Sequence, residues 1–127
     1  MDVQLTSEDI NDCFRIGGRD APKERRPIIV KLAHRSKKVE VMRNKKKLAE
    51  TRFIEEDLTR LRAKLYHTVR KDSKTGKTWT QDCKIFTIIK DRQGHEAKKI
   101  ITTPDELTKI GWTEDGISHF WEEYNKE

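Results

Sequence analysis

The cations near the middle of the chain are the residues whose types and spacing most clearly suggest a chemistry. Seven of them fall within the 13 residues from Arg35 to Lys47, and Glu40 is the only acid between them. Each Lys or Arg that neutralises a phosphate releases condensed counterions, so this segment favours polyanion binding without base choice. The alternative is a solvated helix face that only adds solubility. The candidate phosphate contacts in this segment are Arg35, Lys38, Arg43, Lys45, Lys46 and Lys47.

Aromatic side chains within or just after this basic region add a second kind of contact. Tyr66 and Trp79 have polar neighbours in the sequence, and rings in such places can stack on the bases of a single strand. The neighbours of Phe53 and Phe86 favour packing in a core instead. The sequence therefore predicts core positions for the two Phe residues and leaves Tyr66 and Trp79 open as candidates for base stacking.

Residues that often catalyse reactions or bind metals occur here without the spacing that such sites need. The four His and two Cys residues form no H-x-x-x-H or C-x-x-C pair, and no glycine-rich phosphate loop occurs. Cys83 follows Asp82 without an identifiable base, which favours a small buried strand residue. The acidic run at 55–57 could hold a metal, but an N-cap at Asp57 is favoured. We expect no enzyme, no catalytic residue, no cofactor and no metal.

The sign of the charge changes along the chain, although the net charge is only +6. Residues 1–14 carry four acids and no Lys or Arg. Residues 15–77 carry 21 Lys or Arg against 8 acids, and residues 78–127 carry 7 against 10. A basic middle between acidic ends favours a polyanionic partner.

Length and composition limit the class of protein. A chain of 127 residues with 33% hydrophobic residues and a mean hydropathy of -0.95 suits one ordinary folded domain or two very small ones. No apolar run approaches the roughly 18 to 20 residues of a membrane span, and no secretion signal is evident. With only two cysteines, the sequence predicts an intracellular protein of the cytoplasm or nucleus, and "RNKKK" fits a nuclear-import patch.

In the first half of the chain, short apolar runs predict strands at 10–16 and 27–32, separated by a loop rich in Gly and Pro. Ser36 is the expected N-cap of a helix that runs to about Glu50. A short strand is predicted at 51–57. The apolar half of this region, "PIIVKL", is expected to lie in the interior.

In the second half, four apolar residues at helical spacing predict a helix with one buried stripe: Leu58, Leu61, Leu65 and Val69. Two apolar runs on either side of "DRQG" predict a hairpin. A helix with a capping box is expected from Pro104 to Gly111. A last helix is expected to bury one side formed by Ile117, Phe120, Trp121 and Tyr124.

Four segments occur in an order and spacing typical of a known family: "DINDCFRIGG", "RRPIIVKL", "RFIEEDLTRLRAKLYHTVRK" and "TWTQDCKIF". Over about residues 9 to 110 the sequence resembles the C-terminal part of the baculovirus few-polyhedra protein and the first-open-reading-frame proteins of LINE-type retrotransposons. The resemblance implies an α+β fold: a partial RRM-like sheet with helices in residues 1–57, and a small helix-plus-β-hairpin C-terminal domain in residues 58–127.

The resemblance also implies a function, the clasping of single-stranded RNA or DNA between these two parts. Residues matching the family's cations become further candidates for contacts to the nucleic-acid backbone: Arg15, Arg26, Lys31, Arg62, Arg70 and Lys84. Such binding would be non-catalytic and would have little sequence specificity. The alternative function is a structural or trafficking adaptor that binds acidic protein partners in virus assembly.

Two departures from the family bear on these expectations. The family usually has Gly where Cys83 stands, so the tight turn after Asp82 is expected to differ. An RRM-like fold also needs a first strand and helix, and only Met1 to Asp9 precede "INDCFRI". We therefore expect a fragment, or a sheet completed by another copy, because an incomplete sheet exposes an edge that favours self-association.

Overall fold

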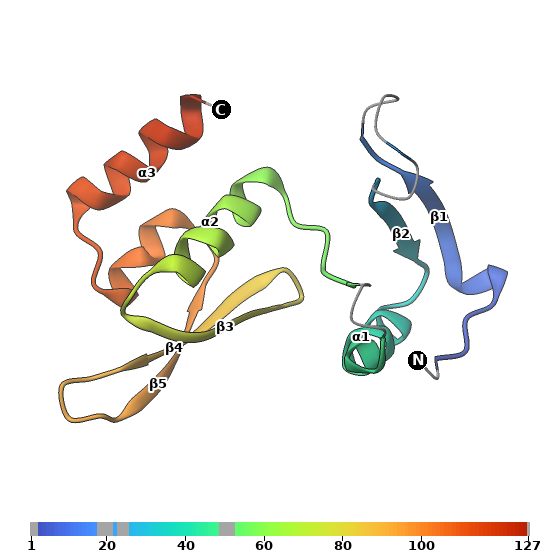
Figure 1. The fold of residues 1–127 in the computed structure, drawn as a ribbon, viewed down its shortest axis with the longest axis horizontal. Coiled ribbons are helices and arrows are strands. Elements are labelled where there is room, and N and C mark those ends of the chain that lie inside the picture. The colour runs from blue at the N-terminus through green and yellow to red at the C-terminus, as the bar shows by residue number, and fades with distance from the viewer. Residues whose placement is uncertain (1–2, 18–21, 23–25, 49–52, 127) are drawn as a thin grey trace. The chain divides into compact units, whose positions relative to one another are not determined.

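The computed structural model describes residues 3–17, 22, 26–48 and 53–126 (Figure 1). Its helices and two small antiparallel sheets confirm the α+β class. The chain divides into an N-terminal unit, Met1–Glu55, and a C-terminal unit, Glu56–Glu127. Within the described ranges, no helix has both the length and the apolar character needed to cross a bilayer.

The N-terminal unit is built from two strands and one helix. A 3-10 turn η1 (Ser7–Asp9) leads into β1 (Ile10–Arg15), which pairs antiparallel with β2 (Ile28–Leu32). The Asp9 carboxylate accepts hydrogen bonds from the backbone N–H and the hydroxyl of Thr6 at 2.9 and 3.2 Å, and the Thr6 backbone bond is the main cause of a lowered pKa for Asp9. The pairing of β1 with β2 confirms the two predicted strands.

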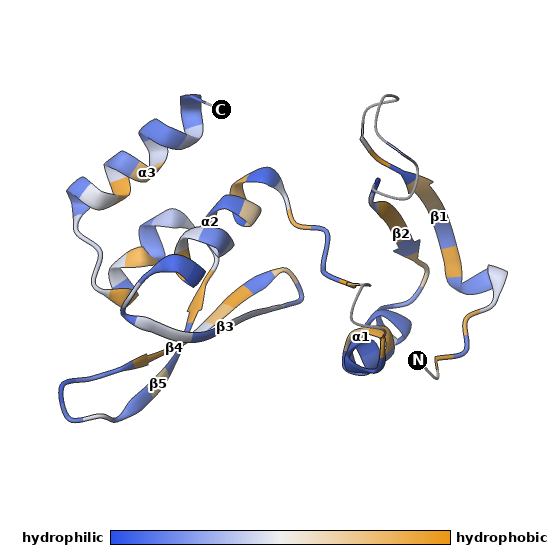
Figure 2. Cartoon of the chain, viewed as in Figure 1, coloured by the Kyte–Doolittle hydropathy of each residue, from blue (hydrophilic) through white to orange (hydrophobic). Residues whose placement is uncertain are grey.

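The apolar residues of this small sheet are largely exposed. Phe14 and Ile16 are each 41% exposed, and Ile28 and Val30 are 50% and 47% exposed, whereas Val41 is the only described hydrophobic residue of the unit in the buried class. Figure 2 shows apolar residues along both strands. The expectation that "PIIVKL" lies in the interior was therefore wrong, because two strands and one short helix offer too little surface to cover it.

The basic helix is shorter than predicted and begins differently. Helix α1 spans Arg35–Asn44 with His34 at the N-cap position, so Ser36 lies inside the helix rather than at its cap. The chain continues as the 3-10 turn η3 (Lys45–Lys47) and becomes extended at Leu48. The predicted end near Glu50 lies outside the described residues.

The segment from Phe53 to Asp57 is not a strand. It has no regular secondary structure, and Phe53 is 83% exposed instead of packed in a core. The N-cap of the next helix is Thr59, whose hydroxyl accepts a hydrogen bond from Arg62 N at 3.3 Å, so the prediction for Asp57 was also wrong. Glu56 belongs to the C-terminal unit because its carboxylate accepts a hydrogen bond from Cys83 N at 2.9 Å.

The C-terminal unit places helices against a three-stranded sheet. Helix α2 (Arg60–Lys71) is followed by β3 (Thr75–Gln81), β4 (Lys84–Lys90) and β5 (Glu96–Ile101), which form an antiparallel meander in this order. The 3-10 helix η4 (Pro104–Ile110) and helix α3 (Glu114–Lys126) complete the unit.

The core of this unit joins the stripe of α2 to one face of the sheet. Leu65 and Val69 from α2 meet Ile85 of β4 and Ile101 of β5, and all four are fully buried. Leu107 and Ile110 of η4 and Phe120 of α3 close the cluster. The predicted stripe of the first helix and the predicted apolar side of the last helix are both confirmed, except that Leu58 precedes α2.

The predicted hairpin at "DRQG" is confirmed, but an additional turn makes the sheet three-stranded. Asp82 and Cys83 both have positive φ, 52° and 61°, and they connect the paired residues Gln81 and Lys84. Two consecutive left-handed residues form the type I′ turn that suits a two-residue hairpin. Cys83 is therefore a turn residue and not, as predicted, a strand residue.

Side-chain hydrogen bonds connect the residue after β5 to η4. Glu106 accepts hydrogen bonds from Lys109 Nζ and Thr102 Oγ1, both at 2.6 Å, and these bonds, with Lys109 first, hold the pKa of Glu106 below its usual value. The predicted capping box joined Thr103 and Glu106. In the structure the Thr103 side chain makes no capping hydrogen bond, and the Glu106 carboxylate accepts one from Thr102 instead. Gly111 ends η4 as predicted, with a left-handed φ of 89°.

Replacing Cys83 with Gly should stabilise the C-terminal unit. Glycine removes the left-handed strain of a residue with a Cβ, worth about 1 kcal/mol, which raises Tm by about 4 to 8 °C in a domain of this size. Thermal unfolding followed by Trp fluorescence reports this unit, since Trp79, Trp112 and Trp121 all lie in it. Cys83→Ala is the control, because it loses the same thiol but keeps the Cβ; equal Tm values for the two variants would contradict the strain argument.

Candidate nucleic-acid interface

The exposed face of the C-terminal sheet collects aromatic and basic side chains. Side chains alternate between the two faces of a strand, and Ile85, Thr87 and Ile101 occupy the buried face. Phe86 lies between the first two of these residues and is paired with Trp79 on β3 and Ile100 on β5. The opposite face therefore carries Trp79, Phe86 and the partly exposed Ile100.

Trp79 and Phe86 form a parallel stack with a lysine on each side. The ring centroids are 5.7 Å apart and the planes differ by 10°. Lys77 Nζ lies 5.6 Å from the Trp79 ring centroid, and Lys98 Nζ lies 5.5 Å from that of Phe86. Lys84 begins β4 two residues before Phe86 and so shares its face. These five residues are called the lysine–aromatic platform: Lys77, Trp79, Lys84, Phe86 and Lys98.

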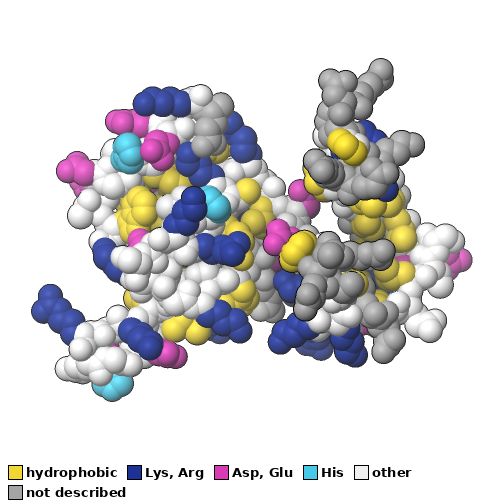
Figure 3. All heavy atoms as spheres, in the orientation of Figure 1, with side chains coloured by type: hydrophobic (Ala, Val, Ile, Leu, Met, Phe, Trp, Pro, Cys, Tyr) yellow, Lys and Arg dark blue, Asp and Glu magenta, His cyan; other side chains and the backbone are white. Residues whose placement is uncertain are grey.

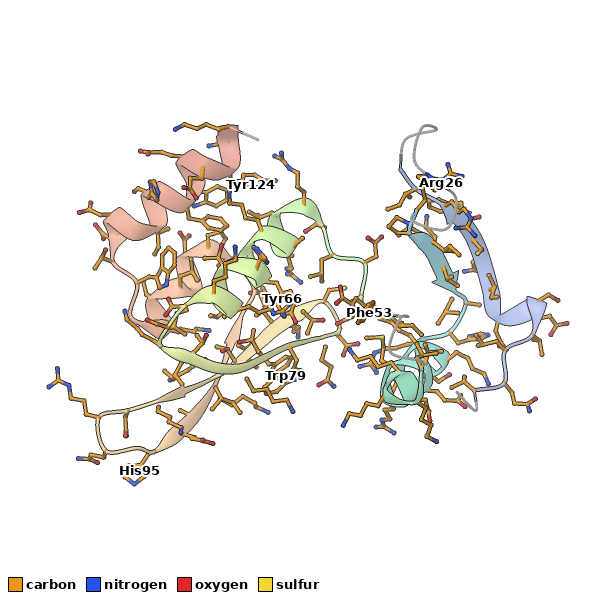
Figure 4. All side chains as sticks on the ribbon, viewed as in Figure 1. Arg26, Phe53, Tyr66, Trp79, His95 and Tyr124 are labelled. Atoms are coloured by element: carbon orange, nitrogen blue, oxygen red, sulfur yellow. The ribbon has the colours of Figure 1, made fainter. Side chains whose placement is uncertain are left out.

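The buried face determines this arrangement. Thr78 and Thr87 are paired across β3 and β4, and their hydroxyls are hydrogen-bonded at 2.9 Å. Because Thr78 is turned inward, Lys77 and Trp79 on either side of it are turned outward. The register of β3 against β4 shifts between Thr75 and Thr78, and from Thr78 onward the pairing is regular. In Figure 4, Trp79 and Tyr66 lie on opposite sides of the β3 ribbon.

The structure brings together Trp79 and Lys84 from the predicted site of this unit, but not Tyr66, Arg62 or Arg70. Tyr66 is half-buried against the core, and the guanidinium of Arg70 lies 5.3 Å from its ring centroid. Arg62 Nη1 donates a hydrogen bond to the backbone O of Cys83 at 2.6 Å. Arg62 therefore supports the turn that orders β3 and β4.

The predicted cations of the N-terminal unit include an exposed group, the basic end of α1, which we define as Arg43 and Lys45–Lys47. All four are exposed. Figure 3 shows Lys and Arg side chains gathered near α1. Arg35 is exposed at the first position of α1, and Lys38 is half-buried one turn later. The basic end of α1 is suited to phosphate contacts, which give affinity without distinguishing one base from another.

The remaining predicted cations lie on the small sheet. Arg15 Nη1 donates to the backbone O of Arg26 at 3.3 Å, which joins the end of β1 to the residue before Pro27. Lys31 Nζ lies 5.7 Å from the ring centroid of Phe14. The Arg26 side chain packs against Gly17, where an added Cβ would lie 3.3 Å from its Cγ. Arg15 and Arg26 thus also have structural contacts within this unit.

Three platform residues were not predicted as site residues: Lys77, Phe86 and Lys98. The sequence prediction placed Phe86 in the core because of its apolar neighbours. The alternation K-x-W and K-x-F in "KTWTQDCKIF" was the available signal, since alternate residues share a face once a two-residue turn is placed at Asp82–Cys83.

A second surface feature of this unit has mixed charge and is less suited to a polyanion. An open hollow beside α2 is lined by Lys64, Lys71, Asp72, Trp112 and Glu123, among others. Asp72 Oδ2 already accepts a hydrogen bond from Trp112 Nε1 at 2.6 Å. Among the residues that the structure describes, no group of three His, Cys, Asp or Glu side chains could hold a metal ion.

The chain was compared with models of protein families, with curated proteins and with solved structures, and none of them matched. The chemistry of the described side chains is therefore the basis for assigning a function. The platform offers parallel aromatic rings and three ammonium groups on one exposed sheet face. This combination can stack with flat rings and neutralise phosphates at the same place.

Arg62 and Arg70 should differ in their effects on stability. Arg62→Ala leaves the Cys83 carbonyl without its charged donor, which should cost about 1 to 3 kcal/mol. Arg70→Ala removes the same charge from an exposed position of the same helix, so its effect should stay within about 0.5 kcal/mol. Urea unfolding followed by Trp fluorescence measures both. Equal losses for the two variants would contradict the structural role of Arg62.

Proposed function

We propose that this chain is a non-catalytic module that binds single-stranded RNA or DNA with little choice of sequence. One observation carries the proposal: Trp79 and Phe86 are half-buried and stacked on the face of the sheet that points away from the core, with Lys77 Nζ and Lys98 Nζ 5.6 and 5.5 Å from their ring centroids. A lysine ammonium rests only weakly on an exposed ring, so a base can replace it. The displaced lysine then remains within reach of the phosphate next to that base.

Stacking explains both the breadth and the limit of the proposed specificity. Every base has a π face, so aromatic platforms tolerate all sequences. Bases inside a duplex are stacked on their neighbours and are not available to Trp79 or Phe86, which favours single strands. Lys84 at the start of β4 supplies a further phosphate contact on the same face.

Cations outside the platform add affinity through charge. The basic end of α1 is exposed in the N-terminal unit, and we assign it to phosphate contacts together with Arg35 and Lys38. Arg15, Arg26, Lys31 and Arg70 are further candidates for phosphate contacts, and each also contacts other residues of its own unit. Contacts of this kind make affinity depend steeply on salt.

The resemblance of four segments to few-polyhedra proteins and LINE first-open-reading-frame proteins supports the same class of ligand. A role within a viral or retroelement nucleoprotein is part of this proposal. An adaptor for acidic protein segments would use the same cations, but it would not need two parallel rings between lysines. The platform therefore favours nucleic acid over an acidic protein.

The platform can be tested by fluorescence polarisation with labelled single-stranded and duplex oligonucleotides at several salt concentrations. Trp79→Ala should weaken single-strand binding by about 10- to 100-fold, because the stacking of one base contributes about 1 to 3 kcal/mol. Lys98→Ala should weaken binding and reduce the slope of log affinity against log salt by about 0.7.

Lys99→Ala is the matched control for Lys98→Ala. The two residues are adjacent on β5, but Lys99 is paired with Thr87, whose side chain is on the buried face. The control removes the same charge from the opposite face, so it should retain nearly all of the affinity. Equal effects of Lys98→Ala and Lys99→Ala, or wild-type affinity of Trp79→Ala, would contradict the assigned platform. Binding that does not change with salt would contradict the proposed function itself.

A further inference from the structure

The N-terminal sheet has an uncovered edge and exposed apolar side chains, and both features favour pairing with another strand. It consists of β1 and β2 alone, so among the described residues each strand has one edge that no other strand covers. Phe14 of β1 and Ile16, the residue after its end, share one face by their spacing, and each remains 41% exposed. Two-stranded sheets are marginally stable in water, and an uncovered edge is a template for pairing with a further strand.

The charges along the two strands distinguish their edges. The chain approaching and entering β1 carries Glu8, Asp9 and Asp12, whereas the end of β1 carries Arg15. Two copies of β1 in antiparallel pairing would therefore place the acidic start of one beside the basic end of the other. The chain around β2 carries only cations, at Arg26, Lys31 and Arg35 among the described residues. Self-pairing of β2 would place like charges together, which is unfavourable.

The hydrogen-bond pattern shows which backbone groups face the uncovered edge of β1. Ile16 N donates to Pro27 O at 3.0 Å, and Phe14 is paired with Ile29 two residues earlier. Residues alternate between facing the partner strand and facing away, so the backbone groups of Cys13 and Arg15 face away from β2. Asp12 Oδ1 accepts a hydrogen bond from Cys13 N at 2.9 Å and occupies this donor in the single chain.

We propose that β1 pairs antiparallel with β1 of a second copy of this chain, in the register that places Phe14 opposite Phe14 of the second copy. In this register Cys13 and Arg15 exchange backbone hydrogen bonds with the second copy, and a carbonyl of that copy replaces Asp12 Oδ1. The two Phe14 rings form a cross-strand aromatic pair on one face. A shift that places Arg15 opposite Arg15 would bring like charges together, and this excludes it.

The result is a four-stranded sheet in the order β2–β1–β1–β2 with twofold symmetry, which is the commonest symmetry of homo-oligomers. The pairing covers the edge of β1 and joins the Phe14 and Ile16 side chains of two copies. It uses residues of the N-terminal unit only. The inference is independent of the proposed function, because no residue of the lysine–aromatic platform takes part.

Sedimentation equilibrium of the whole chain tests the association without any substitution. The weight-average mass should rise with concentration from 15.0 kDa, the mass of one chain, toward twice that value. A mass that stays at one chain up to the highest soluble concentration would overturn the proposal.

Disulfide trapping tests the register. In a background with Cys13→Ser and Cys83→Ser, Phe14→Cys should form a covalent dimer on mild oxidation, because directly opposed residues that do not exchange hydrogen bonds have Cα atoms about 4.5 Å apart. Asp12→Cys in the same background is the control: Asp12 would lie opposite Ile16 of the second copy, far from the other Asp12. Faster or equal trapping through Asp12→Cys would overturn the register.

Discussion

The burial of Ile85, Thr87 and Ile101 on one face of the C-terminal sheet is the constraint on which the candidate interface depends. A slip of one residue in a strand exchanges its two faces, so a register that buries these side chains must place Trp79 and Phe86, both half-buried, on the outward face. The same constraint turns Lys77, Lys84 and Lys98 outward. The platform is therefore a consequence of the way the core is formed.

The two units use their apolar residues differently. The C-terminal unit closes a core of seven buried side chains from α2, the sheet, η4 and α3. The N-terminal unit has one buried hydrophobic residue among those described, Val41, and it exposes Phe14, Ile16, Ile28 and Val30. Burial of apolar surface is the main force that stabilises folds. The N-terminal unit consequently gains more from an added strand than the C-terminal unit does.

The stripe of α2 and the apolar side of α3 could be predicted from the spacing of apolar residues. The "DRQG" hairpin and the stop at Gly111 could be predicted from their glycines. The other turn of the sheet and the N-caps of α1 and α2 were not predicted correctly. The resemblance implied a tight turn after Asp82, but positive φ at the two non-glycine residues Asp82 and Cys83 was not predicted. Phe86 was predicted in the core because of its apolar neighbours, and this prediction hid the platform. Asp57 was predicted as a cap, but Thr59 lies one residue before the helix and takes that role.

An NMR titration with a short single-stranded oligonucleotide tests the central claim most directly. The three indole N–H signals provide internal controls, because Trp112 Nε1 donates a hydrogen bond to Asp72 and Trp121 of α3 packs against the core. The account predicts that the Trp79 indole and the backbone amides of Lys77, Phe86 and Lys98 shift most. Shifts confined to α2 and the hollow beside it, with Trp79 unchanged, would contradict the account.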